Sequence, residues 1–292
     1  MLEKKLIQVG EFIKLGFDSV LTIAKVIAKS GFNVKLTPAS QARCSILGNG
    51  PSLKQSLENH LAFIKSTEMV CVNNFTHSSY FVQLKPQSYA LLDPAFFMYD
   101  GVTFVREDIG ITLTAFSKVD WPMNVFIPME AKKSAYLSNI FQQNANLKPV
   151  YYNYTVIQGF SWFRHWLFKK NLGMQQSQNI LAVSIFLSLN RGFKETFVFG
   201  ADHSWHEQLT VVDNNDLVRK DVHFYDEKEV KATTIIDVVH NQSSRMSDQF
   251  MSLSKAFYSY EVLETYAKHL NLKVYNASAK SYIDAFERIR LS

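Results

Sequence analysis

A glycine-rich turn is the stretch of this chain whose residue types best suit binding chemistry. The residues Gly48-Asn49-Gly50-Pro51-Ser52 follow the apolar run Ser45-Ile46-Leu47. This order predicts a buried strand, a turn, and a helix that begins at Pro51 or is capped by Ser52. Glycines let a ligand approach the backbone closely, and free N–H groups at a helix start favour an anion. The turn is a candidate phosphate or nucleotide site, and an ordinary strand-to-helix turn is the alternative interpretation.

Three further apolar segments also end in polar residues. The expected strand Glu68–Phe75 ends with Asn73-Asn74, Ser88–Phe96 ends with Asp93-Pro94, and Glu195–Asp202 ends with Gly200-Ala201-Asp202. Apolar strands that alternate with helices, including one expected at 177–190, predict an α/β fold with a Rossmann-like, doubly wound, mainly parallel sheet and helices on both faces. Ligands of such sheets bind outside the carboxyl ends of the strands, so these polar ends are expected to converge on one crevice.

The last third of the chain divides into a polar and an ordered part. Residues 203 to about 250 are rich in His, Asp and Asn, and predict a long loop or lid. After it we expect a helix at 252–270, a strand at 272–276 and a final helix at 280–288. The predicted organisation is an N-terminal helical extension, residues 1–42, and one domain, residues 43–292.

Composition and charge indicate which ligands and which cellular location to expect. The 292 residues are 47% hydrophobic and 20% charged, with a formal charge of +5 spread along the chain. This favours a phosphate-bearing ligand or an anionic membrane surface over nucleic acid, and no nucleic-acid partner is expected. The two cysteines, Cys44 and Cys71, fit a reducing compartment, and no run of about 18 apolar residues predicts a spanning helix. We therefore expect a cytoplasmic protein, with the inner membrane face as a peripheral location.

Two segments could contact a membrane. Residues 2–30 carry apolar side chains at helical spacing, which Gly16 is expected to divide into two helices. Packing on the domain is the first interpretation, and a basic amphipathic helix on a bilayer is the alternative. Residues 162–170 combine Trp, Phe and Lys, which suits a membrane interface or a lipid-linked acceptor as well as an ordinary amphipathic helix.

The order of these motifs resembles a known family. The chain is similar to the bacterial sialyltransferases of glycosyltransferase family 42, to motility-associated factor glycosyltransferases and to archaeal hydroxymethylpterin diphosphokinase. The resemblance covers about residues 43–290 and rests on the following motifs: Gly48-Asn49-Gly50-Pro51-Ser52-Leu53-Lys54, Asn73-Asn74-Phe75, Asp93-Pro94-Ala95-Phe96-Phe97, Gly192-Phe193-Lys194-Glu195, Gly200-Ala201-Asp202, Val274-Tyr275-Asn276-Ala277 and Phe286-Glu287-Arg288-Ile289.

The resemblance implies a GT-A-like variant of the Rossmann fold that binds a cytidine nucleotide and requires neither a metal nor another cofactor. It assigns the nucleotide phosphate and ribose to the glycine-rich turn, the donor to Asn73 with Asn74 beside it, and cytidine to Ser177. Gly200 and Asp202 are implied to contact the nucleotide. The absence of an Asp-x-Asp triplet in the sequence agrees with a donor that needs no bridging cation.

The catalytic base does not follow from the resemblance. The family's lid histidine and its two phosphate-binding tyrosines have no clear equivalents, since Ser204 stands two residues after Asp202. His223 and His203 are the two candidates for a base, because a neutral imidazole can accept a hydroxyl proton, although either could make a structural hydrogen bond instead. Tyr225 is a candidate for the leaving phosphate or a packed aromatic, and His240 is expected to be structural.

These observations predict a glycosyltransferase. It would move a sialic, other nonulosonic or related acid from a CMP-activated donor to a bacterial surface glycan, such as lipopolysaccharide or capsule, or to a lipid-linked acceptor. A metal-independent displacement with inversion is expected, and an oligomer is compatible with the sequence. The alternatives are a phosphotransferase like hydroxymethylpterin diphosphokinase, and a non-catalytic nucleotide-binding component of glycan assembly.

Overall fold

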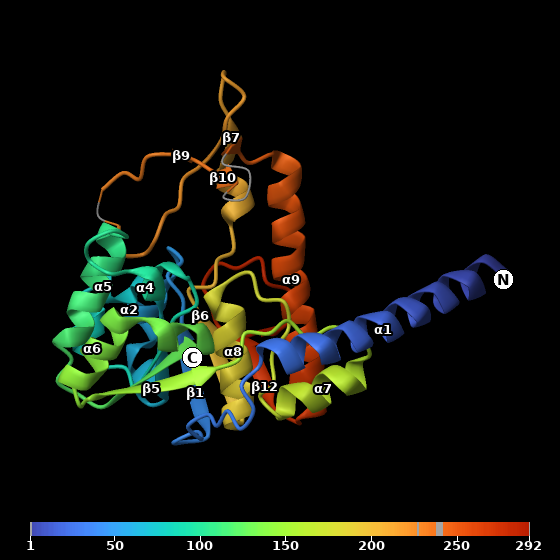
Figure 1. Cartoon of the computed structure of the whole chain (residues 1–292). Helices are drawn as coiled ribbons and strands as arrows, with labels where there is room; N and C mark the ends of the chain where they lie inside the picture. The colour runs from blue at the N-terminus through green and yellow to red at the C-terminus, as the bar shows by residue number, and fades with distance from the viewer. Residues whose placement is uncertain (1, 227, 238–241, 292) are drawn as a thin grey trace.

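An eight-stranded sheet forms the centre of the molecule (Figure 1). The structure is a computed structural model that describes residues 2–226, 228–237 and 242–291. The strand order is β13-β12-β6-β1-β2-β3-β4-β5, and all neighbouring strands pair in parallel. The strands are β1 (Arg43–Leu47), β2 (Glu68–Val72), β3 (Ser88–Ala90), β4 (Met123–Pro128), β5 (Leu147–Tyr152), β6 (Glu195–Phe199), β12 (Lys273–Asn276) and β13 (Glu287–Arg288).

The direction of the chain across the sheet reverses between β1 and β6. Strands β1 to β5 follow one another outward, and the chain then returns to place β6 on the other side of β1. Leu47 pairs with Phe199, so both strands end at the same level. This reversal is the switch point where doubly wound sheets bind ligands. The predicted Rossmann-like α/β fold is confirmed.

Helices cover both faces of the sheet because side chains alternate along each buried strand. Ile46 packs in the cluster that includes α8 and α9, whereas Leu47 packs in the cluster on the opposite face. The first face carries α7 (Ser161–Lys169), α8 (Ile180–Arg191) and α9 (Met246–His269). The second carries α2 (Leu53–Lys65), α3 (Tyr80–Leu84), α4 (Ala95–Met98), α5 (Glu107–Ser117) and α6 (Ala135–Gln143).

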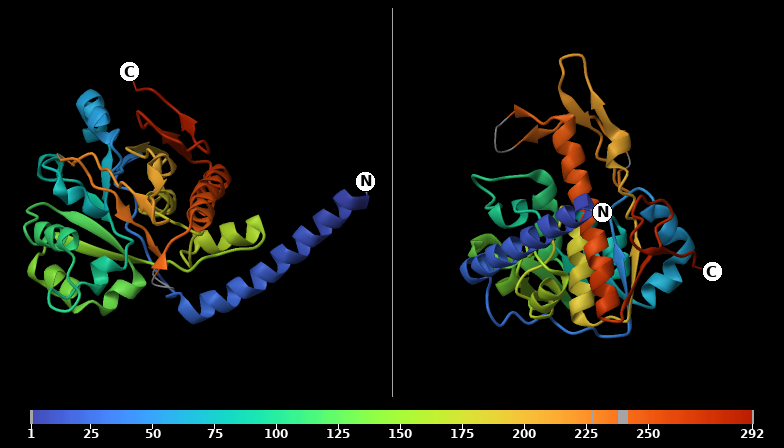
Figure 2. Two further views of the ribbon diagram at one scale, coloured as in Figure 1. Left: turned by 90° about the horizontal axis from the view of Figure 1, so that it is seen from above. Right: turned by 90° about the vertical axis from the view of Figure 1, so that its right-hand side faces the viewer.

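A polar segment stands above the carboxyl ends of the strands (Figures 1 and 2). The described residues of 203–245, called the lid from here on, contain the 3₁₀ turn η3 (Trp205–Gln208) and short antiparallel strands rather than a plain loop. These strands are β7 (Leu209–Val211), β8 (Leu217–Arg219), β9 (Thr233–Thr234), β10 (Ile236–Asp237) and β11 (Gln242–Ser243). Two further 3₁₀ turns, η1 (Asn73–His77) and η2 (Met129–Lys133), follow β2 and β4.

Several predicted boundaries were wrong. The N-terminal segment is one helix, α1 (Leu2–Lys29), because a glycine in a helix costs only about 1 kcal/mol and does not have to end it. Helix α8 begins at Ile180 rather than 177, and α9 begins at Met246 rather than 252. The helix expected at 280–288 is absent from this described segment. Tyr282 N–H instead donates to the carbonyl of Asp202, and β13 extends the sheet.

No helix within the described residues is long and apolar enough to cross a bilayer.

Candidate functional site

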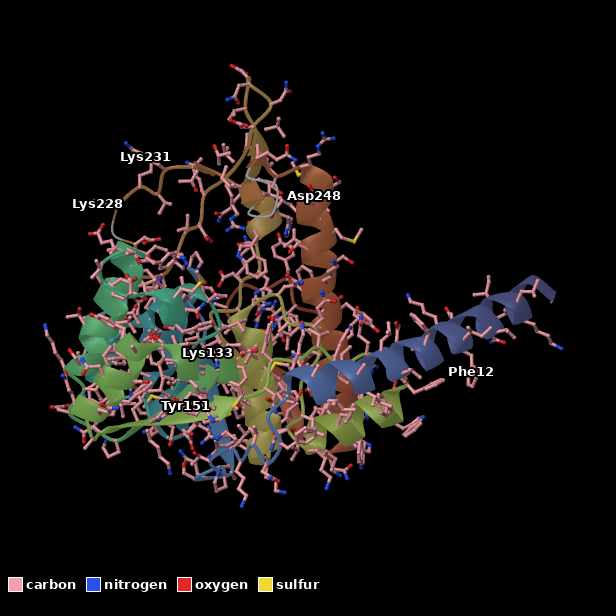
Figure 3. The ribbon with its side chains drawn as sticks, viewed as in Figure 1. Phe12, Lys133, Tyr151, Lys228, Lys231 and Asp248 are labelled. Carbon is pink, nitrogen blue, oxygen red and sulfur yellow. The ribbon has the colours of Figure 1, made fainter. Side chains whose placement is uncertain are left out.

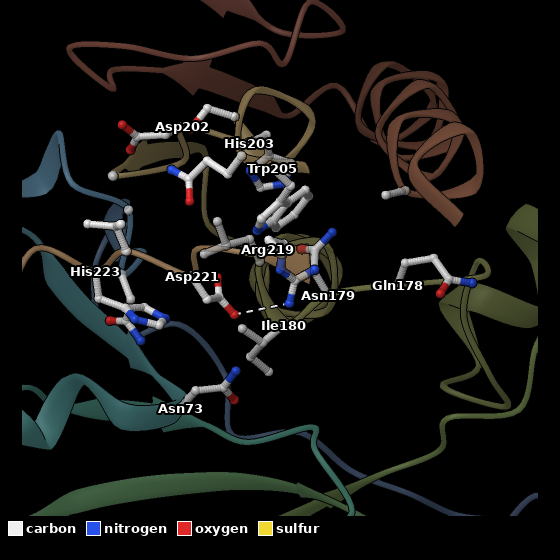
Figure 4. Close-up of a pocket in the computed structure, with 18 of the residues that line it drawn as sticks. Asn73, Gln178, Asn179, Ile180, Asp202, His203, Trp205, Arg219, Asp221 and His223 are labelled. Carbon is white, nitrogen blue, oxygen red and sulfur yellow. Dashed lines mark hydrogen bonds and ion pairs between the residues drawn. The ribbon is translucent and has the colours of Figure 1, made fainter. Parts of the chain in front are cut away.

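A cavity of about 460 Å³ lies where the carboxyl ends of the strands meet the lid (Figure 4). All four polar strand ends identified in the sequence contribute to it. Its wall is completed by the first residues of α8, by the lid and by α9. The strand-end residues that line it are Asn49, Gly50 and Pro51 after β1, Asn73 after β2, Asp93 after β3, and Gly200 and Asp202 after β6.

The glycines after β1 and β6 allow these two strand ends to touch. Gly50 N–H donates to the carbonyl of Gly200 at 2.9 Å, and a Cβ at Gly50 would collide with the Asp202 carboxylate. A Cβ at Gly48 would lie 2.6 Å from the Gly200 carbonyl oxygen. Gly48 does not line the cavity, so its role in the structure is this close approach of two backbone segments.

At the start of α2, where the sequence predicted an anion site, several backbone N–H groups already have partners within the protein. Ser52 donates both its N–H (3.1 Å) and its hydroxyl (2.8 Å) to the Asp202 carboxylate. The N–H groups of Gly48 and Leu53 are also bonded, to Phe199 and Gly50. Burial raises the pKa of Asp202, although the bonds from Ser52 oppose this shift. The carboxylate therefore occupies the position that the sequence assigned to a phosphate.

Three amide side chains of the cavity carry buried atoms without a hydrogen-bond partner among the described residues. They are Asn49 Oδ1, Asn73 Oδ1 and Asn179 Nδ2. The other ends of two of these amides are fixed, since Asn49 Nδ2 donates to the Val72 carbonyl at 3.2 Å and Asn179 Oδ1 accepts from Ala182 N–H at 3.1 Å. A buried polar atom without a partner costs about 1–3 kcal/mol, so a bound ligand that supplied partners would remove this cost.

The amino end of α8 offers a second place for an anion. Asn179, Ile180 and Leu181 line the cavity, and Asn179 caps the helix. The positive end of the helix dipole thus faces the cavity. Ser177, the residue predicted for cytidine, does not line it; its hydroxyl is buried and accepts from Gln175 Nε2 at 2.8 Å. The sequence does carry the correct signal, an Asn directly before the apolar run of α8.

An arginine of the lid also reaches the cavity, and sequence reasoning missed it. Arg219, at the end of β8, pairs with Asp221 at 3.1 Å (Figure 4). Both residues line the cavity, and the Arg219 side chain keeps 30% of its surface exposed. A guanidinium in this position is suited to a phosphate because it presents several N–H donors in a planar fork.

The two histidines differ sharply in their surroundings. His203 is almost fully buried, and its Nε2 lies 2.6 Å from the Tyr260 hydroxyl. Burial lowers its pKa to about 3, so the ring is neutral and a weak base. His223 is half-buried, lines the cavity, and has its Nδ1 3.6 Å from Asp226 Oδ2. A carboxylate beside an imidazole can orient the ring.

The remaining predicted residues make contacts within the protein, and of these Asp93 also lines the cavity. Tyr225 stacks on His223 at 5.1 Å between ring centroids, does not line the cavity, and has its pKa raised by burial. Asn74 Nδ2 donates to Asp108 at 3.0 Å, which ties η1 to α5. Asp93 accepts from Ala95 N–H and pairs with Arg106 at 3.3 Å. His240 lies outside the described residues.

Within the described part of the chain, no group of three or more His, Cys, Asp and Glu side chains is placed to hold a metal ion.

Comparison with known proteins shows a structural likeness but no sequence match. No protein-family model matches the chain, and no curated protein sequence matches it. Among solved structures, the chain is similar to the MAf glycosyltransferase from Magnetospirillum magneticum AMB-1, with a TM-score of 0.50 and 12% sequence identity. The match covers 89% of this chain and 35% of that protein, so this chain spans about a third of its length. At this identity the likeness shows a shared fold.

Proposed function

We propose that this protein is a glycosyltransferase that binds a nucleotide-activated sugar in the cavity at the carboxyl edge of the sheet. The observation that carries the proposal is a set of polar strand ends around one cavity at the switch point, with amide atoms that have no partner among the described residues. The fold shared with a protein described as a glycosyltransferase supports the reaction class. An acceptor hydroxyl of a surface glycan or lipid-linked glycan is the second substrate.

The proposed donor is a CMP-activated sialic, other nonulosonic or related acid, as the resemblance of the strand-end motifs implies. Asn49 and Asn73 would bond to the nucleotide, while the amino end of α8 and Arg219 would hold its single phosphate. This placement moves the phosphate from the predicted turn to the amino end of α8 and Arg219, because Asp202 already occupies the start of α2.

The proposed reaction is a direct displacement with inversion that needs no metal. His223 accepts the proton of the acceptor hydroxyl, and the hydroxyl oxygen forms a bond to the anomeric carbon. The bond from that carbon to the phosphate oxygen breaks, and CMP leaves with the electron pair. Asp226 stabilises the imidazolium that forms, and the positive groups near the phosphate stabilise the charge that grows on CMP. His203 is a positioning residue in this scheme because it is buried and weakly basic.

Transfer and hydrolysis of CMP-sugars by the purified chain, with and without EDTA, test this proposal. The His223→Gln variant should lose at least about a hundredfold in kcat, the usual scale for a general base, while its affinity for CMP stays the same. His60→Gln, on α2 and outside the cavity, is the matched control.

Three results would overturn the proposal. Full turnover by His223→Gln would remove the assigned base. A requirement for ATP or GTP with Mg²⁺ would favour a diphosphokinase. CMP binding without any turnover would indicate a non-catalytic component of glycan assembly.

A further inference from the structure

Helix α1 contacts the rest of the protein through its more polar side, not through its apolar face. A surface helix normally buries its apolar face against the core. Here the side that contacts the body contains Ser19, which is half-buried, and the buried Thr22 and Val26. Thr22 is 0% exposed, and its hydroxyl is bonded to both the carbonyl and the N–H of Gln158. Ser19 accepts from Phe160 N–H. These contacts fix the rotation of the helix about its own axis.

The opposite face of α1 is apolar and exposed. Val20, two residues before Thr22, keeps 65% of its surface accessible. The amino-terminal half of α1 extends away from the body (Figures 1 and 2), and Phe12 lies on this projecting part (Figure 3). We call this surface the α1 apolar face; its exposed residues are Leu6, Val9, Phe12, Ile13, Phe17, Val20, Ile23 and Ile27. It extends over about 30 Å, at a rise of 1.5 Å per residue.

Helix α7 continues this surface. The Phe12 ring lies 5.1 Å from that of Phe160, and Phe160 stacks on Trp162 at 6.4 Å. Trp162 and Trp166 are exposed on one side of α7, and Trp162 is 72% accessible. Tryptophan beside lysine is typical of segments at a membrane–water interface.

The charges around this surface are mainly basic. Helix α1 carries five lysines and three acidic residues, and residues 161–170 carry three basic residues and no acidic one. The apolar face of α1 spans about half of the helix circumference, because Phe12 and Phe17 flank the central row of aliphatic residues. In a two-stranded coiled coil those flanking positions usually carry charges that pair with the partner helix. The wide apolar face, its aromatic border and its basic charge fit anionic phospholipid better than a second copy of the chain.

We propose that α1 and the exposed side of α7 form a membrane-docking surface for anionic phospholipid. Helix α1 lies in the plane of the interface with Ile13 and Val20 among the acyl chains, and Trp162 and Trp166 sit at the headgroup level. The C-terminal half of α1 is held by Thr22 and Val26, so binding fixes the orientation of the whole sheet relative to the bilayer. The inference rests on α1 and α7 and holds whatever reaction the cavity performs.

Vesicle flotation with the full chain tests the proposal. Wild-type protein should float with vesicles of phosphatidylcholine and phosphatidylglycerol, and much less with pure phosphatidylcholine. The double variant Ile13→Gln with Val20→Gln should reduce the partition coefficient by at least about tenfold, since each buried aliphatic side chain contributes more than the ~1.4 kcal/mol that equals one factor of ten. Glutamine keeps a high helix propensity, and circular dichroism checks that the fold is retained.

The matched control is Val82→Gln with Ile111→Gln, the same kind of change at exposed aliphatic positions on α3 and α5. This variant should float like the wild type. Light scattering of the eluted protein supplies a second readout. A wild-type dimer that the Ile13 and Val20 changes dissociate, without vesicle binding, would overturn the proposal in favour of a second copy. Equal flotation of the two double variants would also overturn it.

Discussion

Two groups of buried polar side chains lie at opposite ends of α8, and they differ in how well they are paired. At the end of the sheet where the parallel strands begin, called the amino edge here, Glu68 and Arg191 form an ion pair of 2.6 Å. Their side chains are 1% and 2% exposed, respectively. Arg191 also donates to the Thr37 carbonyl, and Ser40 donates to Glu68. At the carboxyl edge, the amides of Asn49, Asn73 and Asn179 keep unpartnered atoms within the described structure.

The difference separates a stabilising cluster from a candidate binding site. A buried polar network that is fully paired fixes one packing arrangement, whereas a network that is partly paired in the free protein has bonds left for a ligand. Helix α8 connects the two, since its last residue is Arg191 and its cap is Asn179. We infer that changes at the amino edge act on stability, and that changes at the carboxyl edge act on binding.

The largest effect is expected at the amino edge. Glu68→Gln leaves the Arg191 guanidinium buried without its counter-charge, which should lower the free energy of unfolding by roughly 3–5 kcal/mol in urea titrations. Asp120→Asn breaks the exposed pair with Lys85 and should cost no more than about 1 kcal/mol. Equal losses in the two variants would contradict the assigned role of the buried pair.

The pH dependence of stability should reveal His203. Its pKa falls from 6.5 to about 3 on folding because of burial, so the unfolded state binds the proton more readily. The neutral ring's contribution to the free energy of unfolding is fully present above pH 6.5 and is lost as the pH falls toward 3. His203→Asn, which tolerates the left-handed backbone at φ 53°, should flatten this part of the curve. If the free energy of unfolding changed equally with pH in the wild type and in His203→Asn, His203 would not titrate in this way.

A smaller effect is expected at the lid. Arg219→Gln removes the charged donor from the cavity and should weaken CMP binding by about tenfold or more, since hydrogen bonds to charged groups contribute roughly 1.5–3 kcal/mol. Cytidine, which lacks the phosphate, should bind wild type and variant alike. Calorimetric titration measures both ligands, and an equal loss for cytidine would place Arg219 away from the phosphate.

The sequence predicted those cavity residues that can be recognised from their immediate neighbours in the chain. Polar residues directly after apolar runs identified Asn49, Asn73, Asp93 and Asp202, because parallel strands bring their carboxyl ends to one edge. It did not predict the Ser52–Asp202 bond, which closes one wall of the cavity, because that contact joins residues 150 positions apart.

Contacts distant in the chain also explain the other errors. Arg219 reaches the cavity only through the short strands of the lid, which have no strong periodic pattern. The apolar spacing of α1 correctly indicated a helix but not its rotation, because Thr22 and Gln158 determine which side is buried. The predicted helix at 280–288 failed because the edge of β12 was free to pair with β13.

The most direct test of the central claim is a calorimetric CMP titration of the wild type and of Asn73→Gly. Glycine accepts the left-handed backbone of Asn73, φ 45°, so the substitution removes the side chain with its amide and leaves the backbone unstrained. The account predicts an affinity about five- to tenfold lower, from the loss of one hydrogen bond of ~1 kcal/mol or slightly more, with the free energy of unfolding within about 1 kcal/mol of wild type. Unchanged CMP affinity, or no CMP binding by the wild type, would contradict the assignment of the carboxyl edge as the nucleotide site.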